Sequence, residues 1–125
     1  MKVSIEKTEH YALFILNNEN LLENTFSELS SHIENTLNEG NYKYLIFDLS
    51  NLNEISSHVY LFLQQIHDKM ITLDGLLLNT HSNVSFLPVF EENQLLFVPS
   101  TGEAVEYIYM DQLEKQFLGG DELED

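Results

Sequence analysis

Short apolar runs alternate along this chain with longer segments of helical periodicity, and this alternation limits the possible folds more than any other feature. The runs at 11–16 and 44–49 are nearly continuous in apolar residues, as is typical of strands covered on both faces. In the segments that follow these runs, apolar residues recur every three to four positions, as on amphipathic helices. Strands that alternate with helices favour an α/β domain with a mostly parallel sheet and right-handed crossovers.

The periodicity predicts nine elements in the order β-β-α-β-α-β-α-β-α, which correspond to five strands and about four helices. The strands are expected around 3–5 and at 11–16, 44–49, 76–79 and 94–99. The helices are expected at 26–37, 59–70, 84–90 and 100–118, the third of them short because Pro88 limits it. We therefore predict one domain over 1–118, followed by a flexible acidic tail at 119–125.

Local signals set some of the predicted helix ends. Thr25 with Glu28 and Ser100 with Glu103 have the spacing of capping boxes, and Gly40 is expected to end the first helix. The inner face of the last helix is expected to consist of apolar residues in its first half. These residues are Ala104, Val105, Ile108, Tyr109 and Leu113.

The charge balance limits the partners that this chain can bind. Five lysines face 21 Asp and Glu residues, with no arginine, for a formal net charge of −16. Duplex DNA and anionic membranes should repel such a protein at long range, so we expect a protein partner with a basic or mixed surface. The opening residues lack the apolar stretch of a signal peptide, and no run reaches the length of a membrane helix. We therefore expect a cytoplasmic protein.

The signatures of several enzyme classes are missing from the sequence. It contains no cysteine, no glycine-rich phosphate loop, no HExxH pattern and no GxSxG elbow, and its five histidines are scattered. Asp48 ends a buried strand, and its expected role is to bond the backbone amides of the following turn. We therefore predict neither catalysis nor a metal or cofactor.

The most informative stretch is LIFDLSNLNEISSHVYLFLQQI, residues 45–66, where a strand leads into a helix through two adjacent serines. A serine before Val59 can cap the helix, which stabilises it by about 1 kcal/mol relative to alanine. A phosphate can also bind at a helix N-terminus, where it adds roughly −1.5 to −2 charges to a surface that a partner touches. Ser56 and Ser57 therefore have two compatible interpretations, as a cap and as a phosphorylation site.

At these residues the chain resembles the STAS domain of bacterial anti-sigma-factor antagonists. YLIFDLSNLNEISSHVYLFL is similar to the family's segment hhhDLSxhxxhDSSGhxhhh, in which h is apolar, and STGEAVEYIYMDQLE is similar to its closing helix. The ending EKQFLGGDELED resembles the acidic-tailed variety of Bacteroidetes-like bacteria. The resemblance implies a STAS-like fold, a sheet of four or five strands with helices around it.

The same resemblance implies a function and a site. Members of this family bind a serine-kinase anti-sigma factor when unphosphorylated, and phosphorylation of a serine in DSSG ends the interaction. The implied partner-binding residues here are Asn53, Glu54, Ser56, Ser57 and His58, with Ser57 or Ser56 as the phosphate acceptor.

The phosphoserine motif departs from the family pattern in either possible register. Without a gap, Ser56 takes the place of the Asp, Ser57 of the first serine and His58 of the second. With a shift of one residue, both serines are kept and Glu54 approximates the Asp. Val59 replaces the glycine in the first register, and the glycine is also lost in the second. The side chain of Val59 should hinder the approach of a kinase.

Three alternatives to regulated partner switching stay open at this point. The chain could be a degenerate STAS module that binds its partner constitutively. It could be an accessory module for a small ligand or for lipid transport, since STAS domains also occur beside transporters. It could also be an enzyme, because the segment 48–57 lies at the carboxyl ends of strands, where the sites of doubly wound sheets are found.

Overall fold

The computed structural model describes residues 3–17, 23–40, 42–53, 56–81 and 95–124. Within these residues five strands and three helices alternate. They are β1 (Val3–Lys7), β2 (Ala12–Leu16), α1 (Glu23–Gly40), β3 (Tyr44–Asp48), α2 (Ser57–Thr72), β4 (Leu76–Thr80), β5 (Leu96–Val98) and α4 (Thr101–Glu124). The short helix predicted at 84–90 lies outside the described residues. Every other predicted element is present, with ends that differ by a few residues.

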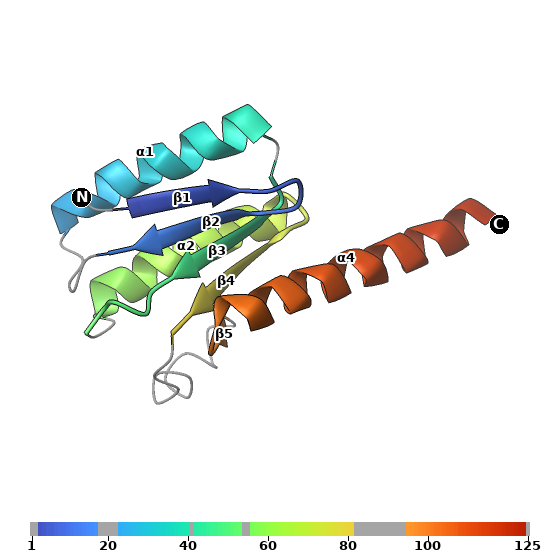
Figure 1. Cartoon of the computed structure of the whole chain (residues 1–125). Coiled ribbons are helices and arrows are strands. Elements are labelled where there is room, and N and C mark those ends of the chain that lie inside the picture. Colours follow the sequence, from blue (N-terminus) through green and yellow to red (C-terminus); the bar gives the residue numbers. More distant parts are fainter. Residues whose placement is uncertain (1–2, 18–22, 41, 54–55, 82–94, 125) are drawn as a thin grey trace.

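The strands form one mixed sheet in the order β1-β2-β3-β4-β5 (Figure 1). β1 is antiparallel to β2, while β2, β3, β4 and β5 run parallel to one another. The prediction of a mostly parallel sheet of up to five strands is therefore confirmed. β2, β3 and β4 are parallel neighbours, so their carboxyl ends lie together at one edge of the sheet. The candidate site lies at this carboxyl edge.

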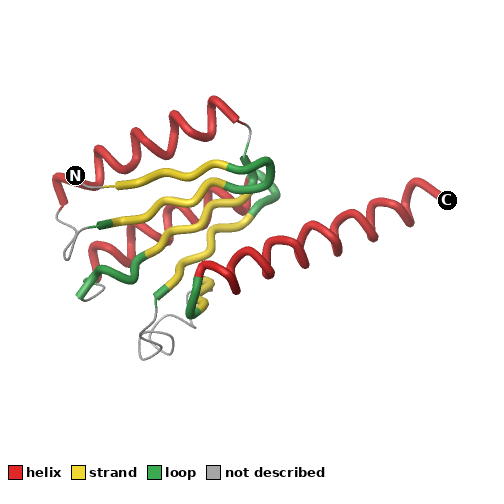
Figure 2. The backbone as a smooth tube through the Cα atoms, in the orientation of Figure 1, coloured by secondary structure: helices red, strands yellow, loops and turns green. Residues whose placement is uncertain are grey.

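The helices cover the two faces of the sheet unequally, as the ribbon and the backbone tube show (Figures 1 and 2). α1 joins β2 to β3 and α2 joins β3 to β4, and both lie on the same face. Two crossovers of the same hand that advance in the same direction must lie on one side of a sheet, so the strand order determines this arrangement. α4 follows the last strand and is the one helix in the described part of the chain that lies on the opposite face.

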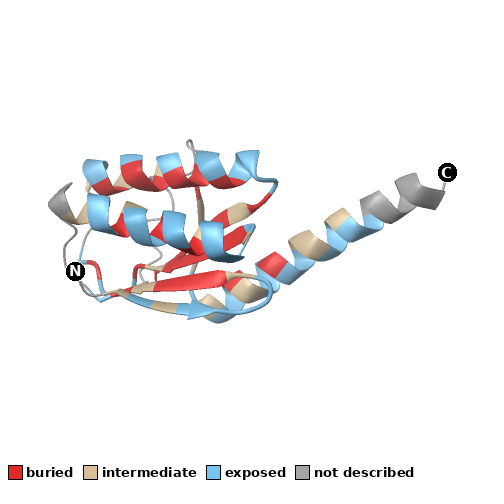
Figure 3. Cartoon of the chain, turned by 90° about the horizontal axis from the view of Figure 1, so that it is seen from above, coloured by how far each residue is buried: buried red, intermediate tan, exposed pale blue. Residues whose placement is uncertain are grey.

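A large apolar core fills the space between the sheet and the two helices α1 and α2 (Figure 3). Phe14 and Phe47 lie at its centre, with ring centroids 5.5 Å apart and an edge-to-face orientation. Near the start of both helices the rings of Phe26 and Phe62 stack at 4.9 Å. The apolar residues predicted at helical spacing in α2 are buried here, which fixes that helix along its length.

The core on the α4 face is smaller. Ala104 and Ile108 are fully buried against Leu13, Ile46 and Leu78 of the sheet. β2 thus contributes side chains to both cores, as expected for a strand that is covered on both faces.

The predicted inner face of α4 is partly wrong. Tyr109 and Leu113 are 50% and 63% exposed, because Asp111 and Lys115 occupy the sheet-facing side of the helix at these turns. Ala104 and Ile108 are buried as predicted, and Val105 is partly buried against the same cluster.

The helix ends confirm two of the three predicted end signals. The Ser100 hydroxyl accepts a hydrogen bond from Glu103 N at 3.2 Å, and Gly40 is the last residue of α1. The cap predicted at Thr25 is wrong, because α1 begins at Glu23 and Thr25 lies inside its first turn.

α4 continues to Glu124, past the glycine pair at which the sequence predicts the domain to end. In Figures 1 and 3 its outer half extends beyond the edge of the sheet. The division into a domain at 1–118 and a flexible tail at 119–125 stays a prediction.

Candidate functional site

The candidate site is built on the loop that follows β3, at the carboxyl edge of the sheet. Asp48 Oδ1 accepts a hydrogen bond from Ser50 N at 3.0 Å, and Leu52 N donates to Leu49 O at 2.9 Å. These two bonds close a tight turn immediately after the strand. The role predicted for Asp48, bonding a turn amide, is therefore confirmed.

Neighbouring strands hold this loop on both sides. On the β2 side, the Asn51 side chain donates to Leu16 O at 3.3 Å. On the β4 side, Leu49 N donates to Thr80 O at 2.9 Å. The loop therefore has a fixed position relative to the sheet, which prepares the start of the following helix.

His81 supports the same loop, a role that the sequence analysis does not predict. It is buried just after β4, and its Nε2 lies 3.0 Å from Leu52 O. A carbonyl oxygen can only accept, so Nε2 carries the hydrogen and donates it. A signal was present in LLLNTH, where an apolar strand ends in three polar residues that the fold buries.

Ser56 caps α2. Its backbone is extended, with φ −72° and ψ 168°, and its hydroxyl accepts a hydrogen bond from Val59 N at 3.4 Å. Ser57 is the first residue of the helix, and His58 follows it in the first turn. The capping role predicted for at least one serine is thus confirmed for Ser56.

The predicted partner-binding residues lie at the surface where the structure describes them. Ser57, His58 and Asn53 are exposed and Ser56 is half-buried, while Glu54 lies outside the described residues. We call the surface formed by Ser56, Ser57 and His58 the α2 corner. It presents two hydroxyl groups and an imidazole at the end of α2 where backbone N–H groups carry partial positive charge.

A shallow hollow of about 580 Å³ lies beside the α2 corner, between α1 and α2. His58 forms part of its wall, and Phe26 and Phe62 contribute apolar surface. Leu61 also lines the hollow and is 60% exposed. The corner therefore combines polar groups with adjacent apolar surface, a combination that suits contact with another protein.

Neither a cluster of metal ligands nor a membrane-spanning helix is found among the described residues. In these parts of the chain, no three His, Asp or Glu side chains are grouped so that they could hold a metal ion. None of the helices in the same parts is both long and apolar enough to cross a bilayer.

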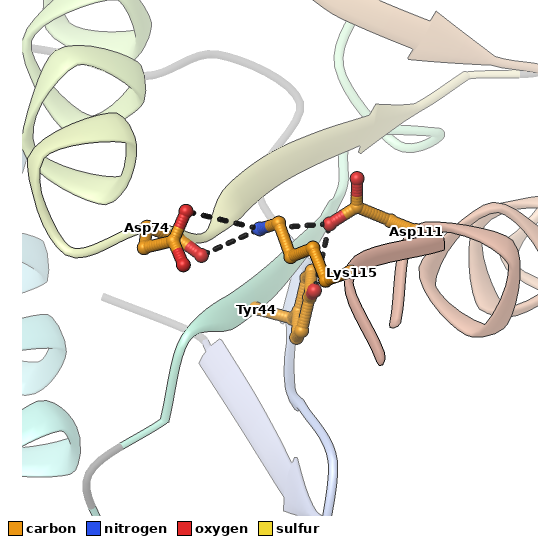
Figure 4. Close-up of polar contacts among 4 residues, drawn as sticks. All are labelled: Tyr44, Asp74, Asp111 and Lys115. Carbon is orange, nitrogen blue, oxygen red and sulfur yellow. Dashed lines mark hydrogen bonds and ion pairs between the residues drawn. The ribbon is translucent and has the colours of Figure 1, made fainter. Parts of the chain in front are cut away.

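A second polar cluster lies at the other edge of the sheet and anchors α4 (Figure 4). The Tyr44 hydroxyl donates to Asp111 Oδ2 at 2.7 Å, and Lys115 Nζ lies 3.0 Å from the same oxygen. Lys115 Nζ also donates to Asp74 O at 2.6 Å and lies 5.4 Å from the centre of the Tyr44 ring. Side chains of α4 are thus joined to β3 and to the turn between α2 and β4.

The same contacts shift two pKa values. Burial, followed by the hydrogen bond to Asp111 and its negative charge, raises the pKa of Tyr44 to about 12. Burial lowers the pKa of Lys115, but the hydrogen bond and charge of Asp111, with Tyr44 and Asp74, outweigh it and raise this pKa overall. Both groups therefore hold their protons more firmly in the folded protein, as expected of a structural anchor.

Solved structures share this fold. An RsbS variant from Moorella thermoacetica, with a serine replaced by glutamate, matches with a TM-score of 0.71 at 15% identity over 87% of this chain and 96% of that chain. The anti-sigma-factor antagonist SpoIIAA in its unphosphorylated form matches with a TM-score of 0.70 at 15% identity, over 86% and 96% of the two chains. Phosphorylated SpoIIAA, a Bacillus cell fate determinant, matches with a TM-score of 0.67 at 15% identity, over 86% and 99%.

No protein-family model and no curated protein matches the sequence. The structural matches nevertheless extend over nearly the whole length of these antagonists. The chain therefore has the STAS fold, which confirms the sequence resemblance as far as the fold is concerned. The relation to acidic-tailed, Bacteroidetes-like members stays a prediction.

Proposed function

We propose that this protein is a non-catalytic regulator that binds a serine-kinase anti-sigma factor through the α2 corner. The observation that carries this proposal is the exposure of Ser57 and His58 at the start of α2, on a fold shared with anti-sigma-factor antagonists. The net charge of −16 favours a partner whose contact surface is basic.

Ser57 is the favoured phosphate acceptor. Its side chain is exposed, whereas Ser56 is half-buried and its hydroxyl already accepts a hydrogen bond from Val59 N. A phosphate on Ser57 would lie in the first turn of α2, where orphan N–H groups and the helix dipole tolerate negative charge. The domain would keep its fold, while a partner that fits the uncharged corner would meet about two additional negative charges.

Val59, which the resemblance predicts to hinder a kinase, is compatible with this proposal. Its side chain is buried in the core beneath α2, so it does not project from the surface that a kinase would approach. The valine therefore replaces the family glycine without placing a side chain on the outer side of the corner.

The test combines the protein with ATP and a serine-kinase anti-sigma factor from the same genome. Mass spectrometry should locate one phosphate on Ser57, and Ser57→Ala should abolish it, while Ser50→Ala, at an exposed serine in the same loop, should not. Ser57→Glu should weaken binding of the kinase at least tenfold, while Ser57→Ala should bind like the wild type. Intact binding without any phosphate would replace the regulated function with the constitutive one, and absence of binding would overturn the proposal.

A further inference from the structure

α4 has a second apolar face in addition to the one that packs on the sheet. Met110, Leu113 and Phe117 are spaced by three and four residues, so they lie in one stripe along the helix. Their side chains are 69%, 63% and 70% exposed, whereas Ala104 and Ile108 on the inner face are fully buried. We call Met110, Leu113 and Phe117 the outer stripe. Apolar side chains at this spacing are typical of a surface that receives another helix.

The outer stripe lies largely on a part of α4 that the domain holds in place. Asp111 and Lys115, on the inner side of the same turns, are bonded to Tyr44 and Asp74. One turn of the helix also contacts the loop between β1 and β2, where Gln112 Nε2 lies 3.3 Å from His10 Nδ1. The exposure of Met110 and Leu113 is therefore a property of an anchored helix.

The surroundings of the outer stripe are acidic. A groove of about 560 Å³ runs along α4 beside β5, and Met110 and Tyr107 line it together with Glu103, Glu106 and Glu114. Among the described residues, no lysine or histidine forms an ion pair with these three glutamates. Lys115, the lysine of this helix, points to the other side and is bonded to Asp74 and Asp111.

We propose that the outer stripe and its acidic border form a second docking surface, which binds a basic amphipathic helix of another protein. Such a helix would bury its apolar side chains against Met110, Leu113 and Phe117. Its lysine or arginine side chains would reach the glutamates on the border. A second copy of this chain is disfavoured as the occupant, because it would place one row of carboxylates against another.

This surface is separate from the α2 corner. The corner lies at the carboxyl edge of the sheet, while the outer half of α4 extends from the opposite edge (Figure 1). A phosphate at Ser57 should therefore leave the outer stripe accessible, and the two surfaces can bind different partners.

The test uses synthetic amphipathic peptides of about 18 residues, long enough to form a helix on binding. One peptide carries leucines at alternating spacings of three and four with flanking lysines, the second replaces lysine by glutamate, and the third scrambles the order of the lysine peptide. Backbone amide NMR shifts of the full chain locate each contact. We expect the ordered lysine peptide to shift amides at 106–117 and to bind at least tenfold more tightly than the other two.

Matched variants separate a specific surface from general attraction to a protein of high negative charge. Leu113→Ser with Phe117→Ser should weaken binding of the lysine peptide about tenfold. Leu61→Ser, at a similarly exposed leucine on α2, should leave binding unchanged. Glu106→Gln with Glu114→Gln should weaken binding severalfold at low salt and have less effect at high salt. Ser57→Glu should leave the affinity for the lysine peptide unchanged. The test of the outer stripe can therefore fail or succeed independently of the test of the α2 corner.

Three results would overturn the proposal. The ordered and scrambled lysine peptides could bind equally well, or the NMR shifts could lie away from α4. Alternatively, sedimentation could show a dimer of the full chain that Leu113→Ser with Phe117→Ser dissociates, which would make a second copy the occupant.

Discussion

The two faces of the sheet bury their side chains in different ways. On one face α1 and α2 lie side by side and enclose a core that contains Phe14, Phe47 and Leu63. On the other face α4 is the helix that covers the sheet among the described residues, with Ala104 and Ile108 fully buried. The first face therefore uses its helices mainly to stabilise the fold, whereas the second leaves much of one helix available for other contacts.

The difference also concerns the type of contact that holds each helix. α2 is held by apolar side chains along its length, while the second half of α4 is held by Asp111 and Lys115 through polar bonds. Polar contacts at a surface contribute less to stability than burial of the same number of apolar side chains. The face covered by two helices should therefore dominate global stability.

The largest effect is expected from Leu63→Ala, which opens a cavity beneath α2. Leu63 is almost fully buried, and such a truncation lowers the free energy of unfolding by about 3 to 4 kcal/mol. Urea denaturation should show a lower midpoint with an unchanged slope, since the truncation hardly changes the surface that unfolding exposes. A loss below about 1 kcal/mol would contradict the dominant role of this face.

Ile108→Ala tests the other face and should cost about 2 to 3 kcal/mol. Ile108 is fully buried, but it lies in the smaller of the two cores, so fewer buried side chains surround the space that its truncation leaves. Amide hydrogen exchange should show a larger loss of protection in α4 than in α1 and α2. Equal loss in all three helices would show that both faces unfold as one unit.

Tyr44→Phe removes the hydroxyl that bonds Asp111 and should cost about 1.5 kcal/mol at neutral pH. In the wild type, the pKa of Tyr44 is raised from 10.0 to about 12, so the folded state holds this proton more tightly than the unfolded state. The resulting stability is complete below pH 10 and is lost as the pH rises toward about 12.

Urea midpoints measured at neutral pH and at about pH 11 test this sign. The wild type should lose more stability than Tyr44→Phe over that interval, although the raised pKa of Lys115 gives both proteins some loss in the same direction. Identical losses would show that the Tyr44 hydroxyl does not carry the alkaline dependence.

The smallest effects are expected at the two helix caps. Ser56→Ala and Ser100→Ala each remove a hydroxyl that accepts a hydrogen bond from a backbone N–H in the first turn of a helix. Each substitution should lower the free energy of unfolding by about 1 kcal/mol. Ser57→Ala, next to the first cap, should stay close to the wild type. Thermal denaturation can compare the three variants, and a loss at Ser57 equal to that at Ser56 would contradict the assignment of the cap.

Periodicity was sufficient to predict most of the fold. The continuous runs of β2 and β3 read correctly as strands covered on both faces, and α2 shows one clear apolar stripe. α4 is different, because it has apolar residues on two opposite sides. Local periodicity cannot show which side meets the sheet, and the correct choice depends on the distant partners Tyr44 and Asp74.

The candidate site was predicted in part. The capping role of one serine and the turn bond of Asp48 follow from local chemistry, so the sequence contains enough information for both. The support from His81 depends on β4 lying beside β3, which brings residues 52 and 81 together. Contacts between distant segments of this kind leave only a weak trace in local sequence.

The turn between α2 and β4 also helps to hold a helix that begins far along the chain. A side chain at Gly75 would overlap the Lys43 carbonyl, which accepts the hydrogen bond from Leu76 N that starts the β3–β4 pairing. Asp74, beside it, has a φ of 62° and supplies the carbonyl that binds Lys115. A larger residue at 75 would therefore disturb this turn and displace the carbonyl that binds Lys115, so a substitution far from α4 in the sequence would weaken one of the contacts that hold that helix.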